Sequence, residues 1–67
     1  MIELGPFKSK SGKRYIGIFT SESNTVAVLG PMQEAGGVAP RVFEETASSE
    51  EEARKRILDA INQGEIE

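Results

Sequence analysis

The stretch RYIGIFTSESNTVAVLG, residues 14–30, decides the fold of this 67-residue chain. Its two ends, 14–20 and 25–30, are rich in β-branched and aromatic residues, which favour extended strands. The four residues SESN between them are typical of a turn. The stretch therefore predicts two strands joined by a tight connection.

Shorter candidate strands lie on either side of this stretch. Residues 2–7 and 41–45 have the same strand-like composition. The segment KSKSGK supplies the turn after the first strand, and residues 31–40 form a longer loop before the last one. The pattern indicates two successive hairpins, 2–20 and 25–45.

The segment SSEEEARKRILDAINQG, residues 48–64, predicts a helix at roughly 50–62. Ser48 and Ser49 are both suitable N-caps, and each has a glutamate three residues later, which is the capping-box spacing. Gly64 is a plausible helix stop. An apolar stripe at helical spacing comprises Ala53, Ile57, Leu58, Ala60 and Ile61. We expect Ile57 and Leu58 to be among the most buried residues, with Ile61 beside them.

These elements predict a single α+β domain spanning residues 1–67. Its sheet is an antiparallel meander of three to four strands, and the C-terminal helix packs on one sheet face. Alternation along 14–20 puts Tyr15, Gly17 and Phe19 on one face and the isoleucines between them on the other. We expect the isoleucines to lie under the helix, because the opposite choice places Gly17 at the centre of the core. Tyr15, Gly17 and Phe19 then form a candidate interaction surface.

The tripeptide Leu-Gly-Pro occurs twice, at residues 4–6 and 29–31. Proline cannot donate to a sheet ladder, so Pro6 and Pro31 indicate strand ends or bulges. A phosphate-binding loop is the functional alternative, but neither copy has the P-loop spacing and no helix follows. The repeat therefore indicates architecture or chance rather than ligand binding.

Composition excludes several classes of protein. The chain has no Cys and no His, so it lacks disulfides, the thiol nucleophile and the commonest general base. We expect no catalytic residues, no cofactor and no metal. No apolar run approaches membrane-spanning length, and no signal peptide is recognisable, so we expect a cytoplasmic protein with no membrane association.

An apolar face that the helix leaves uncovered predicts protein–protein association. Its cover is a second copy, another protein, or the loop 31–40 of the same chain. The hypothesis that we favour is a non-enzymatic interaction module, with a homodimer as its simplest form. The charged helix face is a further candidate contact for another protein, formed by Glu51, Glu52, Lys55 and Asp59.

The alternative function is weak nucleic-acid binding by the first hairpin. Residues 1–33 have four basic and two acidic side chains, a balance of +2, whereas residues 34–67 have four and nine, a balance of −5. Phosphates would contact the basic cluster, namely Lys8, Lys10, Lys13 and Arg14, and bases would stack on Tyr15 and Phe19. The segment KRYIGIF resembles the RNP1 strand of RNA-binding folds in its basic start and aromatic residue, but lacks that motif's glycine and further aromatics.

Overall fold

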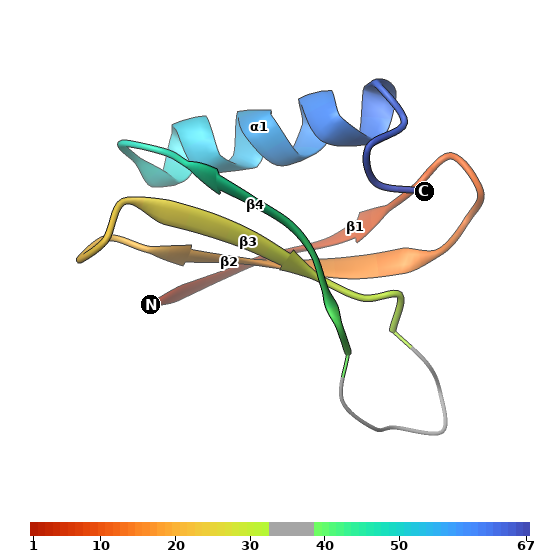
Figure 1. Cartoon of the computed structure of the whole chain (residues 1–67), viewed down its shortest axis with the longest axis horizontal. Helices are drawn as coiled ribbons and strands as arrows, with labels where there is room; N and C mark the ends of the chain where they lie inside the picture. The colour runs from red at the N-terminus through yellow and green to blue at the C-terminus, as the bar shows by residue number, and fades with distance from the viewer. Residues whose placement is uncertain (33–38) are drawn as a thin grey trace.

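The computed structural model describes residues 1–32 and 39–67 as one sheet and one helix (Figure 1). The elements are β1 (Ile2–Lys8), β2 (Arg14–Thr20), β3 (Thr25–Leu29), β4 (Arg41–Thr46) and α1 (Glu50–Asn62). Neighbouring strands pair antiparallel in the order β1-β2-β3-β4. The predicted meander followed by a helix is confirmed, and each strand begins where the sequence predicts. Within the described part of the chain, no helix is long and apolar enough to cross a membrane.

Both ends of α1 follow from local sequence. The Ser49 hydroxyl accepts a hydrogen bond from the Glu52 backbone N–H at 3.1 Å, so Ser49 rather than Ser48 is the N-cap. Gly64 has a φ of 82°, and its N–H donates to the Ile61 carbonyl. The next N–H donates to the Ala60 carbonyl, which completes a Schellman motif. The prediction that Gly64 stops the helix is confirmed.

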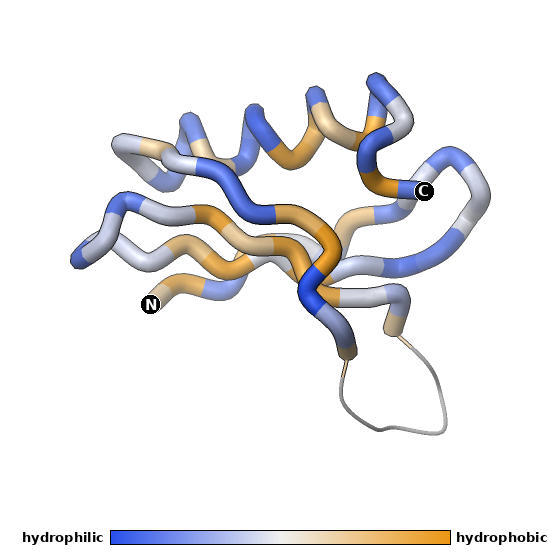
Figure 2. The backbone as a smooth tube through the Cα atoms, viewed as in Figure 1, coloured by the Kyte–Doolittle hydropathy of each residue, from blue (hydrophilic) through white to orange (hydrophobic). Residues whose placement is uncertain are grey.

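The apolar side of α1 faces the sheet (Figures 1 and 2). The buried helix residues are Ala53, Ile57, Ala60 and Ile61. Leu58 is 48% exposed, so the expectation that it is a core residue is wrong. Consecutive helix residues are about 100° apart, and the stripe centred on Ile57 and the two alanines leaves Leu58 on the flank.

The sheet presents the opposite face to the helix from the one that the sequence predicts. Tyr15 and Phe19 are only 3% and 4% exposed and belong to the core beneath α1. Their assignment, with Gly17, to an uncovered interaction surface is therefore wrong. A Cβ at Gly17 would lie 2.5 Å from the Cδ1 of Ile57. Ile57 therefore occupies the space that a side chain at residue 17 would fill. The glycine that argued against this face is what lets the helix pack on it.

The two Leu-Gly-Pro segments lie on either side of Ile16 in β2. The first forms a bulge within β1, between the pairs Leu4–Gly17 and Phe7–Tyr15. The second follows the pair Ile16–Leu29 at the end of β3. Both glycines have positive φ, 106° at residue 5 and 152° at residue 30. The expectation of strand ends or bulges is confirmed for both copies, since the first lies at a bulge and the second follows the end of β3.

The C-terminal residues return to the first hairpin. Ile66 is 2% exposed and belongs to the core cluster. The hydroxyl of Tyr15 donates a hydrogen bond to the backbone carbonyl of Glu67, which gives this buried phenol a polar partner. The tail thus closes one end of the core, next to the turn between β1 and β2.

Candidate functional site

The side of the sheet that faces away from α1 has an apolar centre. Strand register places Ile16 beside Leu29, and Ile18 beside Ala27, on this side of β2 and β3. Ile16, Ile18 and Leu29 are half-buried, although no described helix or strand lies over them (Figure 1). We call this surface the open face; it comprises Glu3, Ile16, Ile18, Ala27, Leu29, Arg41 and Glu44.

Charged residues border this apolar centre on the two outer strands. Arg41 of β4 is in register with Leu29, and Glu44 of β4 is in register with Ala27. Their side chains form an ion pair at 2.8 Å and are 60% and 52% exposed. A shallow hollow of about 250 Å³ lies between this pair and the strand residues Ile18, Ala27 and Leu29. The open face is therefore apolar at its centre and charged at its rim.

The expectation that the loop 31–40 covers this face falls mainly on residues 33–38, which lie outside the described residues. Met32 is described, and its N–H donates a 2.8 Å hydrogen bond to the carbonyl of Arg14. The loop therefore leaves the sheet beside β2.

The basic cluster of the first hairpin is exposed, but one member has a structural contact. The Nζ of Lys10 donates a 2.8 Å hydrogen bond to the carbonyl of Asn62, the last residue of α1. The last turn of α1 has no basic residue, so Lys10 brings a positive charge to the negative end of the helix dipole. Lys8, the last residue of β1, and Arg14, the first residue of β2, are paired in register.

The aromatic part of the nucleic-acid hypothesis is wrong. Tyr15 and Phe19 are buried in the core, where no base can stack on them. The four basic side chains, Lys8, Lys10, Lys13 and Arg14, remain exposed. Phosphate binding by them stays a prediction without an aromatic platform to support it.

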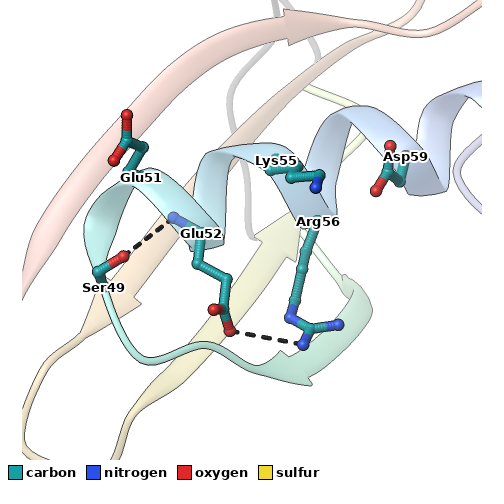
Figure 3. A pocket seen from close by; sticks show the side chains of 6 residues that line it. All are labelled: Ser49, Glu51, Glu52, Lys55, Arg56 and Asp59. Carbon is teal, nitrogen blue, oxygen red and sulfur yellow. Dashed lines mark hydrogen bonds and ion pairs between the residues drawn. The ribbon is translucent and has the colours of Figure 1, made fainter.

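The charged side of α1 forms a surface hollow of about 570 Å³ (Figure 3). Its lining comprises Ser49, Glu51, Glu52, Lys55, Arg56 and Asp59. All belong to one helix and its cap, so the hollow is a shallow space between exposed side chains. Within the described residues, no group of three potential metal ligands gathers here or elsewhere.

The structure perturbs the titration of Glu52 on this helix face. Its carboxylate accepts hydrogen bonds from the backbone N–H and the hydroxyl of Ser48, at 3.2 and 3.1 Å. These bonds, and then the charge of Arg56 at 3.4 Å, hold the pKa of Glu52 below its ordinary value of 4.5. The ionised form is thus the one that the folded chain favours.

This shift predicts the pH dependence of a Glu52→Gln variant. A lowered pKa in the folded state stabilises the protein above pH 4.5, and this contribution disappears as the pH falls through the folded-state value. We therefore expect Glu52→Gln to be less stable than the parent chain at pH 7 and to approach it below pH 4. Urea unfolding at both pH values measures this difference. A deficit that persists unchanged at pH 3 would assign the role of Glu52 to packing rather than charge.

Comparisons with protein-family models, curated proteins and solved structures find no significant match to this chain. The chain is a small α+β meander, and its function is inferred from the features of its own surface. The most distinctive of these is the open face.

Two contributors to this arrangement have sequence signals that the pattern analysis left out or interpreted in the opposite sense. Ile66 is an apolar residue two positions after the helix stop, and the pattern analysis gave it no role. Gly17 is a glycine in the middle of a strand, which often marks a site of close approach by another segment. The glycine is compatible with the observed face of β2 but does not by itself select it.

Proposed function

We propose that this protein is a non-enzymatic interaction module that self-associates through the open face. The observation that carries the proposal is the apolar centre formed by Ile16, Ile18, Ala27 and Leu29 on a sheet side with no described element over it. Antiparallel sheets with one solvated face normally alternate apolar and polar residues along each strand. Here β2 and β3 are apolar on both faces, which is typical of a sheet packed on both sides.

The small size of the domain means that it gains stability when a partner buries more of its apolar surface. A chain of 67 residues buries about 60% of the surface that its unfolded form exposes, and this chain has no disulfide. Each Å² of apolar surface removed from water contributes about 25 cal/mol. A partner that covers the isoleucines and Leu29 thus stabilises the fold as well as forming a complex.

A second copy suits this face better than a nucleic acid does. The rim carries both signs of charge, with Arg41 and Glu44 on β4 and Glu3 on β1, so the rim of an identical face offers counter-charges. A phosphate backbone meets the two glutamates unfavourably. The absence of Cys and His from the chain is consistent with the proposed lack of catalysis, and we propose the cytoplasm as its compartment.

The test is a pair of lysine substitutions with the same chemistry on opposite sides of the molecule. We expect the parent chain to approach twice its mass of 7.3 kDa as its concentration rises from micromolar to about 1 mM, since a single small sheet face belongs to the weak class of interfaces. Ile18→Lys places a charge in the centre of the open face and should remain at the monomer mass. Leu58→Lys, on the exposed flank of α1, should associate like the parent. Light scattering measures all three.

Circular dichroism checks that each variant is folded. Ile18→Thr keeps the β-branched shape and serves where the lysine variant unfolds; it should weaken association at least several-fold. A parent chain that stays at 7.3 kDa up to 1 mM contradicts self-association. Loss of association in Leu58→Lys, with Ile18→Lys unaffected, would assign the interface to the helix side instead.

A further inference from the structure

Side-chain size and charge on the open face vary along the strands as well as across them. One transverse row contains Ile16, Leu29 and Arg41, and the next contains Glu3, Ile18, Ala27 and Glu44. The first row thus holds the larger residue of β3 and the basic residue of β4. The second row holds the smaller residue of β3 and the acidic residue of β4. Size and charge therefore change in the same direction between the two rows.

Two packed sheets that are related by a twofold axis can adopt two arrangements when their strands are aligned. An axis that runs across the strands, between the two rows, places each row over the other row of the second copy. Leu29 then faces Ala27 of the second copy, and Arg41 faces Glu44 of the second copy. Large meets small, and basic meets acidic.

An axis that runs along the strands, between β2 and β3, gives the opposite result. Each row then lies over the same row of the second copy with its ends exchanged. Glu44 faces Glu3 of the second copy, and this contact occurs twice by symmetry. Like charges that face each other across an interface disfavour it.

We propose that the second copy packs on the open face with its strands antiparallel to those of the first, related by a twofold axis across the strands. This inference rests on the proposed self-association. Arg41 of each copy pairs with Glu44 of the other, in exchange for the exposed 2.8 Å pair within one chain. Ile16 of each copy lies over Ile18 of the other at the centre.

A spin label at the turn between β2 and β3 distinguishes the two axes. The chain has no cysteine, so Ser21→Cys provides a unique labelling site, and Ser21 is exposed. Gly17 lies between the two rows, so residue 21 is roughly 13 Å from an axis across the strands, at about 3.3 Å per residue. Since packed sheets are about 10 Å apart, the two labelled sites should be separated by roughly 28 Å. An axis along the strands brings them to roughly 11 Å, from the same spacings and about 4.8 Å between strands.

Charge reversal at the rim provides a second test that does not depend on a label. Arg41→Glu and Glu44→Arg should each lose the dimer mass, because each places two like-charged pairs across the axis. A mixture of the two variants should recover a dimer, in which an acidic rim faces a basic rim. Within each variant chain, residues 41 and 44 still carry like charges after mixing. Recovery of the dimer mass in the mixture therefore reports on contacts between copies. The axis along the strands predicts instead that Glu44→Arg strengthens association, because the new arginine faces Glu3.

The outcomes separate the two proposals. Monomer mass of the parent chain at every concentration contradicts self-association itself. A parent dimer whose labels lie near 11 Å, or whose Glu44→Arg variant associates more tightly, contradicts the antiparallel arrangement and leaves self-association standing. A label distance near 28 Å in the parent dimer supports both self-association and the antiparallel arrangement. The same holds if the two charge-reversal variants form a dimer when mixed but not separately.

Discussion

Replacement of Ile57 with alanine is expected to lower the free energy of unfolding by about 2–5 kcal/mol, the usual range for a fully buried isoleucine. Ile57 is 0% exposed and fills the space above Gly17, so its truncation leaves a cavity in the core. A domain of 67 residues has roughly 3–10 kcal/mol of total stability, at about 0.05–0.15 kcal/mol per residue. The substitution should therefore remove a large fraction of the fold's stability. Urea unfolding at 25 °C measures the effect.

The matched control is the next residue in the chain. Leu58 is 48% exposed, so Leu58→Ala should cost less than about 1 kcal/mol, near the range of surface substitutions. Ile57→Val, which removes one methyl group, should cost about 0.5–1.5 kcal/mol and remain measurable where Ile57→Ala unfolds. Equal losses for Ile57→Ala and Leu58→Ala would show that the helix faces the sheet with a different stripe.

Replacement of Gly30 with alanine is the second large effect, and we expect a loss of about 2–6 kcal/mol. The φ of 152° costs a side-chain-bearing residue roughly 1–3 kcal/mol. A Cβ there would also overlap the ring of Tyr15 and lie 3.1 Å from the carbonyl oxygen of Arg14. Overpacking of this kind adds about 1–3 kcal/mol. Neither obstacle yields easily, since the ring is buried and the carbonyl is part of β2.

Gly12 is the control that separates the backbone term from the crowding term. Its φ is 87°, but an added Cβ would meet nothing within 4 Å. Gly12→Ala should therefore show only the conformational cost, about 1 kcal/mol. Thermal unfolding of the two variants side by side measures the difference. Similar losses at both positions would mean that Tyr15 and Arg14 can move away at little cost.

The sequence by itself determined the elements of this protein and their order. Its strands are set by β-branched and aromatic runs that end at turn residues, and α1 is set by the serine cap, the acidic first turn and Gly64. These signals act between residues close in the chain, so they do not depend on what packs above them. Gly64 is the clearest example, because its Schellman hydrogen bonds lie wholly within residues 60–65.

The open face follows from a choice that only the tertiary structure made. Both faces of β2 are apolar, so alternation identifies which residues share a face but gives no preference between the two faces. The contact between Gly17 and Ile57 decided it: a strand without a Cβ at its centre lets the helix approach closely, with Tyr15 and Phe19 packed beside Ile57 in the core. That contact joins residues 40 positions apart, which no local pattern encodes. Ile16 and Ile18 lie on the open face because the helix packs on the other side of the sheet. Leu58 lies on the exposed flank of α1 for the same reason.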